Sequence, residues 1–129
     1  MTLELKLLGC SVVLGLIYVL VAAVLGTQQR GLLWNAGNRD GDPKPLTSFA
    51  ARAHRASSNF LETFPFFAAA ILAVVATGRA TPHTALGAEI YVWARAAYLP
   101  VYVLGIPYLR TLIWAASLWG ILQVLEALF

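Results

Sequence analysis

Two arginines, an amide and a carboxylate stand three or four residues apart in one stretch of the chain, as Arg52, Arg55, Asn59 and Glu62. Because an α-helix turns once in about 3.6 residues, this spacing predicts one polar stripe on one helix face, opposite Ala, Phe and Leu side chains. The stretch runs directly into an apolar segment, residues 66–77. Ionisable groups on a membrane helix face a bundle interior or a wet cavity, so the stripe predicts a functional site.

A second polar stripe follows later in the chain, where Tyr91, Arg95, Tyr98 and Tyr102 are separated by four, three and four residues. With a rise of about 1.5 Å per residue, the two stripes match in depth if their helices run in opposite directions. We therefore predict one cytoplasm-facing cleft lined by Arg55, Asn59, Tyr98, Tyr102 and Arg110, with Glu62 reaching Arg95 beneath it.

The residue types of this cleft favour an anionic ligand. Several guanidinium groups accompany a single carboxylate, and guanidinium binds carboxylates through two parallel hydrogen bonds. Asn59 adds a donor and an acceptor, the tyrosine hydroxyls add donors, and Glu62 can accept from an amide or ammonium group. The expected ligand is small, polar and multiply carboxylated. It would enter from the cytosol, while a hydrophobic second reactant would come from the membrane.

The composition is that of an integral membrane protein. Of the 129 residues, 60% are hydrophobic and 12% charged, whereas a soluble domain is about half apolar and a quarter charged. The length suits a single domain, residues 1–129. A dispersed net charge of +3 gives no reason to expect nucleic acid as a partner. One cysteine and two distant histidines predict no disulfide framework and no metal site.

Hydrophobic runs and turn formers predict four membrane-spanning helices, at about 5–27, 46–77, 86–104 and 108–128, with a polar loop over 28–45. The fold class is therefore an all-α up-down bundle. Basic residues gather on the side of the long loop, which places that loop in the cytoplasm and both termini outside it.

Several residues have more than one reading. A buried pair between Arg95 and Glu62 would also serve only to hold the bundle together. Arg52 is either a ligand contact or a side chain that reaches the interface along its apolar stem. Tyr91 is expected to pack in the core, and His54 to be solvated or at a subunit contact.

The pattern Arg55-x-x-x-Asn59-x-x-Glu62-x-x-Pro65 resembles the second-helix signature of the MAPEG proteins, which include microsomal glutathione transferases, leukotriene C synthase and microsomal prostaglandin E synthase. The stripe from Arg95 to Tyr102, followed by Pro107-x-x-Arg110-Thr111, is similar to the signature of the family's third and fourth helices. Together with the four-helix plan, the resemblance covers nearly the whole chain.

The resemblance implies a bacterial-type homotrimer of the inner membrane that binds glutathione as co-substrate between neighbouring subunits, on the cytoplasmic side. By position, glutathione would be held by Arg55, Asn59, Glu62, Tyr98 and Tyr102, with Arg95 beside them. Arg110 would face the thiol, and Arg30 would match an arginine lent by the adjacent subunit. Two departures are Thr63, where the leukotriene branch has tyrosine, and the spacing between Tyr102 and Arg110.

Three classes of function fit these residues. The first is a membrane glutathione transferase or peroxidase that directs the thiolate at lipophilic electrophiles or lipid hydroperoxides. The second is a non-catalytic membrane protein that binds an anionic metabolite or a lipid head group. The third is a small transporter, which is disfavoured because the sequence has no pair of broken helices.

Overall fold

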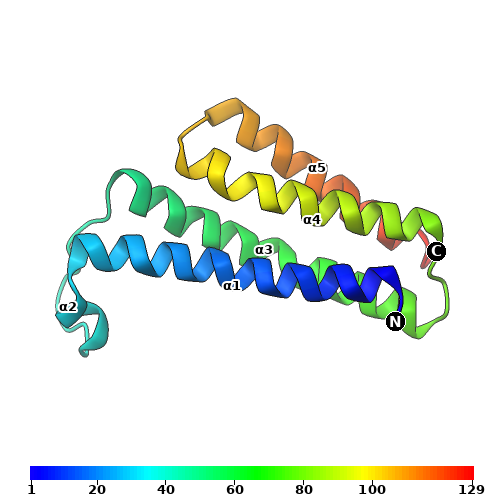
Figure 1. Ribbon diagram of the computed structural model, residues 1–129, viewed down its shortest axis with the longest axis horizontal. Helices are drawn as coiled ribbons and strands as arrows, with labels where there is room; N and C mark the ends of the chain where they lie inside the picture. Colours follow the sequence, from blue (N-terminus) through cyan, green and yellow to red (C-terminus); the bar gives the residue numbers. More distant parts are fainter.

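Four long α-helices and one short helix form the computed structural model, which describes residues 1–129. The long helices are α1 (Leu3–Arg30), α3 (Ser48–Ala76), α4 (Pro82–Val103) and α5 (Pro107–Glu126), while α2 (Leu32–Ala36) follows α1 after a single glycine. In Figure 1, α1 and α3 run side by side and α4 and α5 form a second pair beside them. Both termini lie at one end of this all-helical bundle, and the α4–α5 turn lies at the other.

Three of these helices, α1, α3 and α5, are long and apolar enough to cross a membrane. The outer face of α1 is almost entirely aliphatic, and only Glu4, Ser11, Tyr18 and Gly26 of this helix are buried. Such a surface requires lipid or another protein chain to cover it. α4 carries His83, Glu89 and Arg95 and is not among the three apolar spans. The arrangement with four spanning helices therefore stays a prediction.

The start of α4 differs from the predicted residue 86. The helix begins at Pro82 because Thr81 and Thr84 form a capping box. The Thr84 amide donates to Thr81 Oγ1 over 3.3 Å, and the Thr81 amide donates to Thr84 Oγ1 over 2.8 Å. Pro82 occupies the first helical turn, where its missing N–H has no cost. Residues 82–85, which were predicted to precede the helix, therefore form its first turn.

The predicted loop over 28–45 is also partly helical, since α1 continues to Arg30 and α2 occupies Leu32–Ala36. The Gln29 side chain donates to Thr47 O and accepts from the Thr47 amide, both over 2.8 Å. Arg30 Nε donates to Lys44 O over 2.7 Å. These bonds join the end of α1 to the residues just before α3, so the polar side chains hold the connection between α1 and α3 in one conformation.

The α4–α5 pair depends on two glycines that face each other. A Cβ atom on Gly87 would lie 2.7 Å from Gly120 O, and one on Gly120 would lie 2.6 Å from Gly87 O. The two backbones therefore touch where both helices lack side chains. Next to this contact, Tyr91 stacks on Phe67 with ring centroids 3.9 Å apart, in agreement with its expected packing role.

A buried polar contact joins the beginnings of α1 and α4. Glu4 is only 3% exposed, and Thr84 Oγ1 donates to its Oε1 over 2.6 Å. No basic side chain forms an ion pair with Glu4. The contact holds the N-terminal end of α1 on the N-terminal end of α4, at the opposite end of the bundle from the predicted cleft.

Candidate functional site

A cavity of about 260 Å³ lies where α3, α4 and α5 meet. We call it the α3–α4–α5 cavity. Six of the eight predicted site residues line it, together with Ser58, which the sequence did not single out. α3 supplies Arg55, Ser58, Asn59 and Glu62, α4 supplies Tyr98 and Tyr102, and α5 supplies Arg110. Helical spacing thus brings residues of both polar stripes to one place, as their matching depths predict.

Tyr102 lies between the two cavity arginines. Arg55 Nε donates to the Tyr102 hydroxyl over 3.0 Å, and the Arg110 guanidinium carbon lies 4.6 Å from the centroid of the Tyr102 ring. An aromatic face attracts a guanidinium group and so helps to hold two like charges close together. Because the Tyr102 hydroxyl accepts from Arg55, its own hydrogen remains free to bond a ligand. The edge-on contact with Tyr98, 5.5 Å between centroids, fixes the ring.

Arg95 lies behind the cavity rather than in its lining. Its side chain is fully buried, with its guanidinium carbon 4.4 Å from the Tyr98 ring centroid and 5.3 Å from that of Phe60. Arg95 Nη1 donates to Asn59 Oδ1 over 2.9 Å, while Nε and Nη2 have no hydrogen-bond partner. In the structure Arg95 contacts Asn59, which lines the cavity. A direct contact between Arg95 and a ligand stays a prediction.

Glu62 and Arg95 form no ion pair, contrary to the expectation from the sequence. Glu62 is exposed and lines the cavity, whereas Arg95 points into the core between α3 and α4. The prediction was wrong because matching depth along two helices does not fix the direction in which each side chain points.

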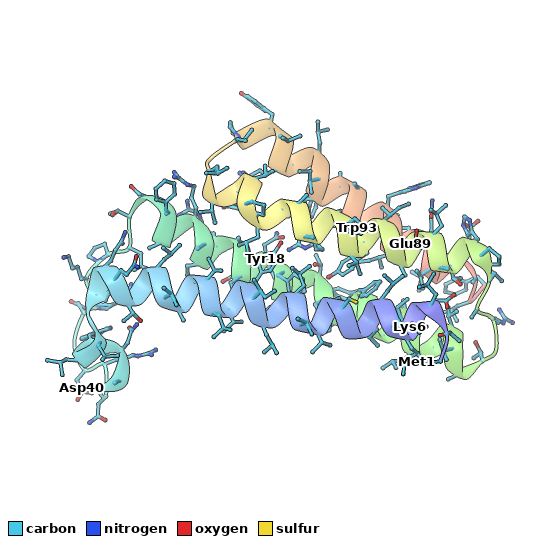
Figure 2. All side chains as sticks on the ribbon, viewed as in Figure 1. Met1, Lys6, Tyr18, Asp40, Glu89 and Trp93 are labelled. Atoms are coloured by element: carbon cyan, nitrogen blue, oxygen red, sulfur yellow. The ribbon has the colours of Figure 1, made fainter.

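Tyr18 supports Arg95 from α1. Its hydroxyl donates to the backbone oxygen of Arg95 over 2.5 Å, and its ring lies 5.7 Å from the Arg95 guanidinium carbon. Tyr18 is completely buried, on the side of α1 that faces α4 (Figure 2). Tyr18 was not among the residues predicted to form the site. The available signal was a lone tyrosine in an otherwise aliphatic run.

Arg30 lies apart from the other predicted residues. It lines a separate cavity of about 370 Å³ between α1 and α3, whose polar lining includes Asn35, Arg39, His54 and Ser57. The only residue common to this cavity and the α3–α4–α5 cavity is Ser58. Within one protomer, Arg30 is therefore not part of the cluster around Arg55 and Arg110.

The α3–α4–α5 cavity can bind a ligand that carries both signs of charge. Arg55 and Arg110 offer guanidinium donors for carboxylates or a thiolate, and Glu62 offers an acceptor for an ammonium group. Asn59 has its oxygen occupied by Arg95, so its amide nitrogen remains as a donor. A small, multiply carboxylated ligand for this cavity stays a prediction.

The fold and the site define an all-helical membrane protein with an arginine-rich cavity among its helices. Residues 7–127 match the model of the MAPEG family, so the chain belongs to this family, and the resemblance noted in the sequence is confirmed. The family includes glutathione transferases and peroxidases as well as other members. We found no match among curated proteins or among solved structures.

Proposed function

We propose that the protein is a glutathione-dependent membrane enzyme that activates the glutathione thiol for reaction with a lipophilic substrate. The observation that carries the proposal is the lining of the α3–α4–α5 cavity, with two arginines, two tyrosines, an amide and one carboxylate. Glutathione has complementary groups, since it carries two carboxylates, one ammonium group and a thiol. Arg55 binds a carboxylate, and Glu62 binds the ammonium group.

Arg110 is the residue to which we assign the chemistry. A free thiol has a pKa of about 8.5, and only the thiolate is a good nucleophile. A guanidinium group beside the sulfur favours the thiolate, and each unit by which the pKa falls corresponds to about 1.4 kcal/mol. The Tyr102 ring beneath Arg110 fixes the guanidinium without neutralising its charge.

Two reactions follow from a bound thiolate. With an electrophile, the sulfur electron pair forms a carbon–sulfur bond. In a substitution the leaving group departs with the electron pair of the broken bond, and in an addition the electron pair of the broken double bond is protonated. With a lipid hydroperoxide, the sulfur attacks the outer oxygen, the oxygen–oxygen bond breaks, and the lipid leaves as an alcohol after protonation. A second glutathione then reduces the oxidised sulfur, giving the disulfide and water.

We further propose that the working unit is a homotrimer. In the single chain Arg30 lies away from Arg55 and Arg110, and the apolar faces of its helices need a partner or lipid to cover them. In a trimer, Arg30 of a neighbouring protomer completes the glutathione site. The α1–α3 connection and the α4–α5 turn then face the cytoplasm of a bacterial cell, and the second substrate arrives through the inner membrane.

Two variants test this assignment. Arg110→Ala is expected to lower turnover about a hundredfold while glutathione still binds, because it removes the group that stabilises the reacting sulfur. Arg55→Ala is expected to weaken glutathione binding about tenfold, through loss of a charge-assisted hydrogen bond. Isothermal titration and a conjugation assay with a panel of electrophiles separate the two effects. Arg79→Ala, at the other end of the bundle, serves as the control.

The competing function is that of a non-catalytic protein that binds an anionic metabolite or a head group through the same arginines. The ultraviolet absorbance of bound thiolate near neutral pH distinguishes the two. An enzyme raises the thiolate fraction of bound glutathione above that of free glutathione, and Arg110→Ala abolishes the increase. Bound glutathione that titrates like the free tripeptide would contradict the enzymatic assignment.

A further inference from the structure

A second basic cavity lies beside the α3–α4–α5 cavity, at the α4–α5 turn. It has a volume of about 240 Å³ and is lined by Arg52, Arg55, Tyr102, Gly105, Pro107 and Arg110. We call it the three-arginine cavity. No acidic residue lines it, and none of the three arginines takes part in an ion pair. The cavity therefore concentrates positive charge that the protein itself does not neutralise.

The arginines of this cavity are held by bonds that leave their donor ends free. Arg52 Nε donates to Val103 O over 2.8 Å, and Arg55 Nε donates to the Tyr102 hydroxyl over 3.0 Å. These bonds engage only the Nε atoms. The Nη groups, which form the fork that binds oxyanions, have no hydrogen bond to the protein in either residue.

The N-terminus of α5 adds to the positive potential. Its N-cap residue is Ile106, whose side chain cannot accept a hydrogen bond, so no side chain caps the first turn. Pro107 opens the helix and lines the cavity. The unpaired N–H groups of a first turn carry the positive end of the helix dipole, which attracts anions.

The surroundings of the cavity indicate an anion attached to an apolar molecule. The neighbouring side chains Phe49, Leu104 and Tyr108 are 50%, 66% and 86% exposed. In Figure 1 the α4–α5 turn lies on the side of the bundle away from both termini, where the α1–α3 connection also lies. Arginines beside exposed apolar and aromatic side chains at a helix end are typical of the head-group level of a membrane. Basic pockets between membrane helices at this level bind anionic lipid head groups.

We propose that the three-arginine cavity binds the phosphate group of an anionic phospholipid, whose chains lie along the exposed apolar surface of α4 and α5. Arg52 donates to the phosphate oxygens through its Nη groups, Arg55 adds positive charge at the wall that the two cavities share, and the α5 N-terminus faces the same anion. Arg55 and Arg110 also line the α3–α4–α5 cavity, whereas Arg52, Gly105 and Pro107 belong only to this one. Arg52 is therefore the residue that reports on this site alone.

Native mass spectrometry of the delipidated full-length protein in detergent tests the proposal. The titrants are short-chain phosphatidylglycerol, which is anionic, and short-chain phosphatidylcholine, which is zwitterionic, with no glutathione present. The wild type is expected to bind phosphatidylglycerol more tightly. Arg52→Gln is expected to weaken this binding about tenfold, through loss of one charge-assisted contact. Because Arg52 also holds the α4–α5 turn, Arg52→Lys is included, and by keeping the charge it should retain part of the affinity.

Arg79→Gln is the matched control, because Arg79 also donates to a backbone oxygen near a helix end, Ala127 O over 3.1 Å, but lies away from the cavity. It should bind phosphatidylglycerol like the wild type. Equal binding of the two lipids, or unchanged binding by Arg52→Gln, would overturn the proposal. So would displacement of the lipid by inorganic phosphate at a matched concentration, which would show that the cavity binds a free anion and not a lipid. Since lipid binding is measured without glutathione, its failure leaves the proposed enzymatic function untouched.

Discussion

The guanidinium group of Arg95 donates from Nη1 to Oδ1 of Asn59 over 2.9 Å, and this bond fixes which end of the Asn59 amide remains free. With its oxygen engaged, Asn59 offers its nitrogen as a donor in the α3–α4–α5 cavity. Arg95 thereby acts on the cavity without lining it. The aromatic rings of Tyr98, Phe60 and Tyr18 surround its guanidinium and limit its movement.

Asn59→Asp tests the direction of this amide. Aspartate keeps an oxygen for Arg95 but replaces the free donor by a second acceptor, which repels a carboxylate of the ligand. We expect glutathione affinity to fall about tenfold or more while the protein remains folded. Isothermal titration measures the affinity, and thermal unfolding in detergent checks the fold. Unchanged affinity would show that the Asn59 nitrogen does not contact glutathione.

Arg95→Met tests whether Arg95 acts through Asn59. Methionine fills part of the space but cannot donate, so the Asn59 amide is free to rotate and glutathione binds less well. In a double-mutant cycle with Asn59→Ala, we expect a coupling energy for glutathione binding of about 1 to 3 kcal/mol. Additive effects of the two substitutions would assign Arg95 a purely structural role.

Gly120→Ala tests the contact between α4 and α5. The added methyl group would lie 2.6 Å from Gly87 O and 2.8 Å from Tyr91 N, and backbone atoms cannot move aside without separating the helices. We expect a loss of stability of about 1 to 3 kcal/mol, measured by thermal or denaturant unfolding in detergent. Gly9→Ala is the control, because nothing lies within 4 Å of a Cβ atom there. Equal stabilities of the two variants would contradict the close packing of α4 on α5.

Thr84→Val tests the buried contact between α1 and α4. Valine has a similar shape but cannot donate to the Glu4 carboxylate, which has no other hydrogen-bond or ion-pair partner. We expect a destabilisation of about 1 to 3 kcal/mol, the cost of leaving a buried acceptor without a donor. The double variant Glu4→Leu with Thr84→Val also removes the carboxylate and should recover the part of the loss that comes from the unpaired acceptor, whereas the loss of the Thr81 amide's bond to Thr84 Oγ1 remains. If Thr84→Val alone unfolds like the wild type, the contact contributes nothing to stability.

The all-helical class and the family were readable from the sequence because both depend on local patterns. Long apolar runs determine helices in a membrane, and the spacing of Arg55, Asn59 and Glu62 places them on one helix face whatever the neighbours are. The start of α4 was predicted too late, at residue 86 instead of Pro82. The capping box of Thr81 and Thr84 extends the helix by another turn.

Only the tertiary structure decided how side chains from different helices pair. The sequence brought Glu62 and Arg95 to the same depth, but the rotation of α4 against α3 directs Arg95 to Asn59, and Tyr18 approaches from α1. The cavity at the α4–α5 turn likewise depends on Arg52 reaching Val103 across 51 residues of sequence. Periodicity fixes the face of a helix on which a residue lies. Which neighbour that face meets is determined by the packing of the helices, and no local pattern of the sequence records it.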